Sequence, residues 1–128
     1  MGIYIVQLGS ARLPDEGVRI GTVRRPPRGV PKAEFAAGNY YDVWLPNLSP
    51  SPELMAEGRA ATNSTEWKRF VRLFRAEMNN GETGKVLDLL AVLSKTTNFS
   101  IGCYCDDESH CHRSVLRELL EQRGADFK

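Results

Sequence analysis

The sequence has almost no net charge and no long apolar run. In 128 residues, 17 lysines and arginines face 16 acidic residues, which leaves a net charge of +1. A balance this close to neutral disfavours a protein that coats nucleic acid. No apolar run approaches the ~20 residues that cross a bilayer, and residues 1–6 lack the basic start and the cleavage site of a signal peptide. We therefore expect no membrane association and a cytoplasmic location.

Cysteine is also scarce, and its placement is uneven. All three cysteines lie between residues 103 and 111, which is an odd and clustered set. Such a set suits reduced thiols in a cytosol better than a disulfide framework. The hydrophobic content of 41% is typical of a folded protein, and the length suits a single domain over residues 1–128.

The apolar pattern predicts both strands and helices. Short runs of β-branched and aromatic residues predict strands over residues 3–8, 18–23, 40–45 and 98–105. Capping residues and helical spacing predict helices that start at Ser51 and at Asn63, a third over 85–93, and a last one that ends near Arg123. No element is predicted between the first two strands or over residues 32–41. The sequence thus predicts an α/β fold, a single compact domain with a small, mostly parallel sheet flanked by helices.

The densest group of reactive side chains spans residues 103–114 and contains every cysteine and both histidines. It follows the last strand and opens the last helix, which is where parallel α/β sheets bind ligands. The N-terminus of a helix attracts anions and favours a thiolate. We therefore predict that Arg113 and Ser114 hold a phosphate or carboxylate. Cys111 and His112 are the candidate catalytic residues, as nucleophile and as acid or base, and Cys111 is expected to be the most reactive thiol.

Two other interpretations of this cluster stay open. Zinc would take Cys103, Cys105, Cys111 and one histidine. A Cys-x-Cys pair on a continuous strand separates its Cα atoms by roughly 6.5 Å, however, and this spacing counts against a shared ion. In the other interpretation, Cys103 and Cys105 are small core residues on the buried face of the strand. We expect no metal and no cofactor.

The loop over residues 24–32 is a second candidate for ligand binding, because it carries four basic residues on a backbone stiffened by three prolines. Arginine holds phosphate and carboxylate with paired hydrogen bonds, and Arg24 and Arg28 are predicted to bind the ligand. Loops that follow parallel strands gather at one edge of the sheet. Arg24 or Arg28 is therefore expected to share one cleft with Arg113, and the predicted partner is a small anionic ligand.

The predicted helix after Asn63 has a basic face, formed by Lys68, Arg69, Arg72 and Arg75. A face of this kind is able to contact nucleic-acid phosphates. It is more often the water-facing side of an amphipathic helix, and Glu66 and Glu77 dilute its charge. We favour the solvated face over nucleic-acid binding. The alternative function is a non-catalytic module that is stabilised by zinc or binds nucleic acid.

Several segments together carry a family resemblance. They are Arg24 with residues 27–30, then residues 44–54, then residues 67–74. These segments resemble the YeaO-like family, which is classed as domain of unknown function 488, and residues 111–114 resemble a motif from other branches of the same superfamily. The resemblance runs from about residue 18 to the C-terminus. It implies a compact α/β domain of a bacterial or archaeal cytosol, with Arg24, Arg28 and residues 111–113 at motif positions.

Overall fold

A parallel sheet forms the centre of the protein, in a computed structural model that describes residues 1–128. Its strands are β1 (Ile3–Gln7), β4 (Phe99–Cys103), β2 (Val18–Gly21) and β3 (Val43–Trp44), in that spatial order. All three strand pairs are parallel, and the central strand β4 is buried along its whole length. The structure therefore confirms the predicted α/β fold with its small parallel sheet in one domain.

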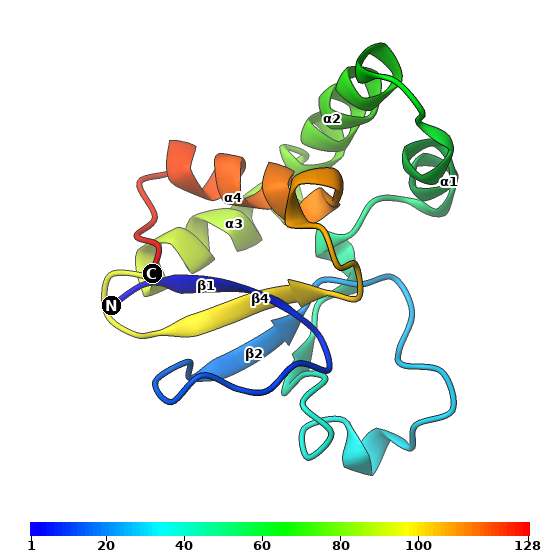
Figure 1. The fold of residues 1–128 in the computed structure, drawn as a ribbon. Coiled ribbons are helices and arrows are strands. Elements are labelled where there is room, and N and C mark those ends of the chain that lie inside the picture. Colours follow the sequence, from blue (N-terminus) through cyan, green and yellow to red (C-terminus); the bar gives the residue numbers. More distant parts are fainter.

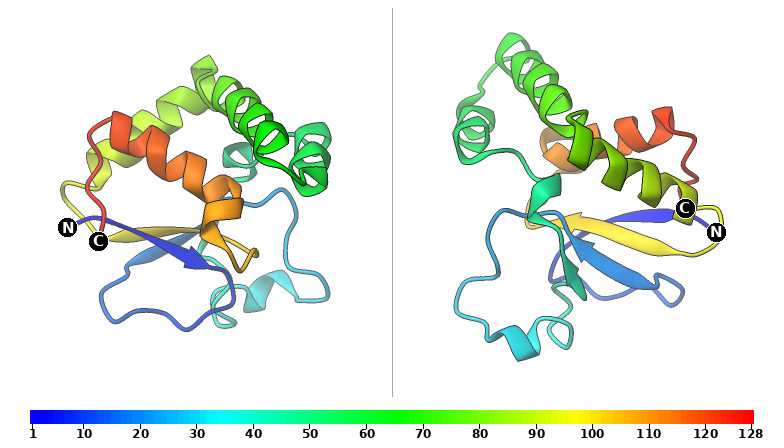
Figure 2. Two further views of the ribbon diagram at one scale, coloured as in Figure 1. Left: turned by 45° about the horizontal axis from the view of Figure 1, so that its top comes forward. Right: turned by 180° about the vertical axis from the view of Figure 1, so that it is seen from behind.

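The helices gather on one side of this sheet. They are α1 (Pro52–Ala60), α2 (Ser64–Met78), α3 (Gly81–Leu93) and α4 (His112–Gln122), with short 3₁₀ turns at Lys32–Glu34, Pro46–Leu48 and Glu108–His110. α3 and α4 cover one face of the sheet, whereas α1 and α2 extend beyond its carboxyl edge (Figure 1). No α-helix lies along the opposite face, where loops and one short 3₁₀ turn run instead (Figure 2). None of the helices has the length and apolar content to cross a bilayer.

Among the element boundaries that differ from the sequence prediction, three concern β3, α3 and β4. β3 has only two residues, because it is an exposed edge strand that pairs with the end of β2 alone. α3 begins at Gly81 instead of Lys85, since its first turn carries no apolar side chain that would signal a helix. The last strand ends at Cys103 instead of Cys105. This third difference changes the chemistry of the cysteine cluster.

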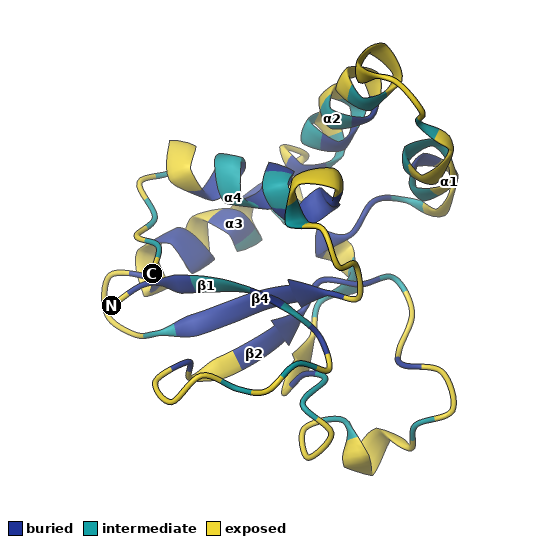
Figure 3. Cartoon of the chain, viewed as in Figure 1, coloured by how far each residue is buried: buried dark blue, intermediate teal, exposed yellow.

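Two apolar clusters stabilise the fold. The larger has 16 buried residues and lies between the sheet and the helices, where the dark-blue segments of Figure 3 face one another. The smaller has five buried residues at the carboxyl edge of the sheet, and these are Leu8, Val23, Tyr41, Cys103 and Cys111. Two of the three cysteines therefore belong to a small cluster of their own, next to the site described below.

The other face of the sheet, which no α-helix covers, carries a buried ion pair. Arg19 on β2 donates from Nε and Nη2 to the two carboxylate oxygens of Glu16, over 2.7 and 2.8 Å. Its Nη1 donates to the carbonyls of Ser10 and Asn39, at 2.9 and 2.7 Å. Both Arg19 and Glu16 are almost completely buried. One arginine thus binds the two loops in which the sequence predicts no element.

Asn63 begins α2, as the sequence predicts. Its Oδ1 accepts from the N–H of Glu66 at 2.9 Å, and its Nδ2 donates to the Glu66 carboxylate at 2.6 Å. Replacing Asn63 by Ala is expected to lower the free energy of unfolding by about 1 kcal/mol, because the N–H of Glu66 loses its acceptor and the Glu66 carboxylate loses a donor. Urea unfolding followed by circular dichroism measures the loss. Ser64→Ala, one residue along, is the matched control and is expected to leave stability nearly unchanged.

Candidate functional site

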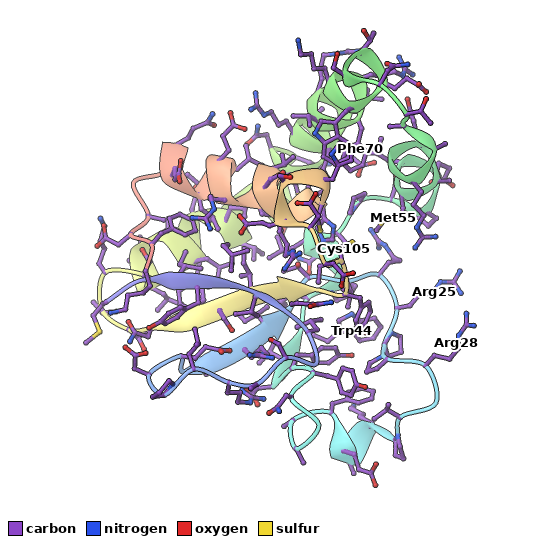
Figure 4. All side chains as sticks on the ribbon, in the orientation of Figure 1. Arg25, Arg28, Trp44, Met55, Phe70 and Cys105 are labelled. Atoms are coloured by element: carbon purple, nitrogen blue, oxygen red, sulfur yellow. The ribbon has the colours of Figure 1, made fainter.

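A pocket of about 290 Å³ lies at the carboxyl edge of the sheet, between β2, β4 and the helices α1 and α2. Met55 on α1 and Phe70 on α2 face it from one side, and Cys105 faces it from the loop after β4 (Figure 4). Its lining contains Val23, Arg24, Arg25, Pro52, Met55, Gly58, Arg59, Trp67, Phe70, Cys103, Tyr104, Cys105, His110, Cys111 and His112. All three cysteines and both histidines thus converge here, at the edge of the sheet that the topology predicts.

The two cysteines of the Cys-x-Cys pair lie close together because the strand stops between them. β1 ends opposite Cys103, and the carbonyl of Cys103 accepts the N–H of Leu8 at 2.8 Å. The chain then leaves the sheet, and the carbonyl of Cys105 accepts from Arg113. The Sγ atoms of Cys103 and Cys105 consequently lie 3.7 Å apart. The expectation that both lie on one buried strand face is wrong for Cys105, whose side chain is exposed.

Cys111 and His112 meet at the first turn of α4, and both are buried. Cys111 is the N-cap residue, and its Sγ lies 3.7 Å from Nδ1 of His112. The Nε2 atom of His112 lies 2.6 Å from the carbonyl oxygen of Thr22. Because a carbonyl only accepts, Nε2 carries a proton, and Nδ1 is the ring nitrogen that faces the Cys111 sulfur. Sequence reasoning missed the role of Thr22, since it acts through its backbone.

The three cysteine side chains differ in the pKa of their thiol groups. Hydrogen bonds from the Cys103 and Cys105 thiols, reinforced by His112, hold the pKa of Cys111 well below its ordinary value. The bond to Cys105 and burial raise the pKa of Cys103. The bond to Cys103 lowers the pKa of Cys105, but the contact with Cys111 and burial outweigh it and raise that pKa. The negative charge of the cluster therefore resides on Cys111, whose sulfur lies beside the ring of His112.

The four residues predicted to bind ligand are not brought together. Arg24 lines the pocket, while its Nε and Nη2 donate to the carbonyls of Ser49 and Pro50. Arg28 is exposed and lies further out on its loop (Figure 4). Arg113 and Ser114 are absent from the lining. Arg113 therefore does not line the pocket that Arg24 lines.

Arg113 instead stabilises the backbone beside the cluster. It is only 3% exposed, and its Nη1 and Nη2 donate to the carbonyls of Val6 and Cys105, each at 2.6 Å. Ser114 turns back on its own helix, where its Oγ donates to the carbonyl of Cys111 at 2.8 Å. Nη1 and Nη2 of Arg113 and the hydroxyl of Ser114 thus all donate to buried or partly buried backbone carbonyls, while Nε of Arg113 has no partner.

Two other arginines supply the charge of the pocket. Arg25, next to Arg24, and Arg59 at the end of α1 are both exposed at the lining and form no ion pair in the protein. The carbonyl of Arg25 accepts from the hydroxyl of Tyr104 at 3.0 Å, which positions this part of the loop. Sequence reasoning placed Arg25 in the basic loop but missed Arg59, which stands alone in its segment and gives no local signal.

Aromatic rings form part of the pocket wall. Trp67 stacks on Phe70 at 4.8 Å and on His110 at 4.5 Å between ring centroids. Phe70 is buried, as expected for the core side of α2, whereas Trp67 is only partly buried and lines the pocket. The stripe of aromatic residues on α2 thus serves both the core and the pocket.

The basic face of α2 is partly neutralised by acidic neighbours. Arg69 pairs with Glu57 of α1 at 2.5 Å, and Arg75 pairs with Glu118 of α4. Lys68 and Arg72 remain exposed. The face therefore presents a mixture of charges to solvent.

The fold and the site define a class of protein: a small α/β domain with a thiol–imidazole cluster at the floor of a pocket beyond the carboxyl ends of its strands. The chain belongs to the DUF488 group, because the DUF488-N3a family model, described as the active DUF488-N3 subclade, matches residues 3–124. This match confirms the resemblance seen in the sequence. No curated protein and no solved structure matches the chain.

Proposed function

We propose that this pocket binds a small organic anion, a phosphate or carboxylate attached to an apolar or aromatic group. The observation that carries the proposal is the charge of the lining, which contains three arginines and two histidines but no aspartate or glutamate. Arg25 and Arg59 have no acidic partner, so their guanidinium groups are free to form paired hydrogen bonds with an oxyanion.

The apolar part of the lining supports a ligand that is more than a bare ion. Met55, Trp67 and Phe70 offer a thioether and two stacked rings in the same lining as the arginines. A volume of about 290 Å³ is at the lower end of the range for small-molecule sites. A ligand held by Arg25 and Arg59 against Trp67 would lie directly over the thiol–imidazole cluster, where Cys111 and His112 are the groups we propose to act on it.

Phenyl phosphate is a probe with both features. In a Trp44→Phe background, Trp67 is the sole tryptophan and reports on the pocket by its fluorescence. Phenyl phosphate is expected to quench it in a saturable manner, and phenol is not. Arg59→Gln and Arg25→Gln should each weaken binding by about tenfold or more, because each removes charge-assisted hydrogen bonds to the phosphate.

Arg28→Gln is the matched control, since Arg28 lies on the same loop as Arg25 but outside the pocket lining. It is expected to bind phenyl phosphate as tightly as the parent protein. Equal quenching by phenol, or an affinity that neither Arg25 nor Arg59 influences, would remove the basis for an anion site.

A further inference from the structure

The donor atoms at the floor of the pocket are spaced like the ligands of one metal ion. Cys103 Sγ, Cys111 Sγ and a ring nitrogen of His112 all lie within 4.8 Å of one another. The Cys103–Cys105 sulfurs are 3.7 Å apart, and Cys111 Sγ is 3.7 Å from His112 Nδ1. A tetrahedral ion with bonds of ~2.3 Å to sulfur separates its ligand atoms by about 3.8 Å. The cluster thus needs little movement to become a coordination sphere.

The structure also removes the objection to zinc that the sequence raises. A continuous strand would hold the thiols of a Cys-x-Cys pair apart, but β4 ends at Cys103. Arg113 holds the carbonyl of Cys105, so the chain turns and brings its sulfur to that of Cys103. Cys105 is therefore placed to act as a fourth ligand.

His112 is oriented as metal-binding histidines are. Such histidines donate their second ring N–H to a carbonyl or carboxylate, which fixes the tautomer and the plane of the ring. Here Nε2 donates to the carbonyl of Thr22 at 2.6 Å, and Phe74 packs edge-on against the ring at 5.7 Å. Nδ1 is thus the ring nitrogen directed toward Cys111 before any ion binds.

We propose that Cys103, Cys111 and His112, completed by Cys105, bind one Zn²⁺ ion. Three sulfurs and one imidazole are a donor set that selects Zn²⁺ or another soft cation, and the absence of carboxylates from the lining disfavours Mg²⁺ and Ca²⁺. The positive charge of the ion offsets the negative charge of the thiolates, which are packed together in a buried cluster. This assignment goes beyond anion binding, because Arg25 and Arg59 line the pocket but are not among the four ligands. In the zinc-bound protein, Cys111 and His112 would be ligands of the ion and would not act on the anion.

The four ligands are not equivalent. Cys103, Cys111 and His112 are buried, whereas Cys105 is exposed on the loop that lines the pocket. The ion therefore lies at the floor of the pocket, with Cys105 as the ligand nearest to solvent. With four protein ligands the coordination sphere would be closed, which is the arrangement of structural rather than catalytic zinc sites.

The test is metal uptake by the full chain. After treatment with EDTA and dialysis, wild-type protein is expected to take up one equivalent of Zn²⁺. It should also give the intense visible absorption of tetrahedral Co²⁺, with a thiolate charge-transfer band, when cobalt replaces zinc. Cys111→Ser and His112→Gln should weaken Co²⁺ binding by more than about 100-fold, and Cys105→Ser by about tenfold. His110→Gln, which removes the other histidine, should leave Co²⁺ binding unchanged.

A second measurement covers variants that fail to fold. In wild-type protein, one equivalent of Zn²⁺ should slow the alkylation of all three cysteines by at least about tenfold, as mass spectrometry of the labelled peptides reports. Wild-type protein that takes up neither Zn²⁺ nor Co²⁺ would overturn the proposal. So would Co²⁺ binding that survives unchanged in folded Cys111→Ser and His112→Gln variants. Neither result would alter phenyl phosphate binding by Arg25 and Arg59.

Discussion

Replacing Glu16 by Gln is expected to destabilise the protein by about 3–5 kcal/mol, because it leaves the guanidinium of Arg19 buried without its counter-charge. Both carboxylate oxygens of Glu16 accept from Arg19, and Oε2 also accepts from the hydroxyl of Ser100 at 2.6 Å. The carboxylate thereby joins the loop before β2 to the two central strands. Urea unfolding followed by circular dichroism measures the loss.

Glu57→Gln is the matched control for Glu16→Gln. Glu57 pairs with Arg69 between α1 and α2, but the pair is in contact with solvent. Its loss is expected to cost about 1 kcal/mol or less, because water solvates both charges when the pair is broken. Equal losses for Glu57→Gln and Glu16→Gln would mean that the buried pair adds nothing to stability.

The same carboxylate makes stability depend on pH. Burial alone would raise the pKa of Glu16, but hydrogen bonds from Arg19, Ser100 and the N–H of Leu13 lower it from 4.5 to about 2. The stabilisation is therefore fully present above pH 4.5 and is lost as the pH falls toward 2, and it amounts to about 3 kcal/mol. Wild-type protein should lose more stability between these pH values than Glu16→Gln does, a difference that unfolding curves at pH 6, 4 and 3 would measure.

The elements that the sequence predicts well are those with a repeating apolar pattern. α2 begins at its predicted cap, α4 ends before Gly124 as predicted, and β1 and β2 lie within one or two residues of their predicted ends. The spacing of the apolar residues in such segments indicates which side of the helix or strand faces the core. The position of the site follows in turn, since parallel strands place the loops that follow them at one edge of the sheet.

The rest depends on contacts between segments that are distant in sequence. Arg19 binds carbonyls of two loops, and nothing in its local pattern distinguishes it from a solvent-facing arginine of a strand. β4 stops at Cys103 because its neighbours stop there, and this is not visible in the Cys-x-Cys spacing. Arg59 joins the pocket only because α1 packs beside α2. In each case, the role of the residue is set by what lies across from it in the fold.

Arg113 is another residue whose role is set by distant segments of the chain. Its replacement distinguishes a structural role from a role in ligand binding. Arg113→Met is expected to lower the free energy of unfolding by about 3 kcal/mol or more, because methionine preserves much of the side-chain volume but donates no hydrogen bond. The carbonyls of Val6 and Cys105 would each lose a charge-assisted bond of 2.6 Å. Thermal and urea unfolding measure the loss.

The affinity for phenyl phosphate, in contrast to the stability, should not depend on Arg113. Arg113 is absent from the pocket lining, so folded Arg113→Met protein is expected to bind phenyl phosphate within about twofold of the parent, whereas Arg59→Gln loses affinity at unchanged stability. Arg28→Met, an exposed arginine exchanged in the same way, should change neither quantity. If Arg113→Met instead kept its stability and lost phenyl phosphate binding, the guanidinium would belong to the pocket. The two carbonyls would then need other donors, and the turn at Cys105 would no longer depend on Arg113.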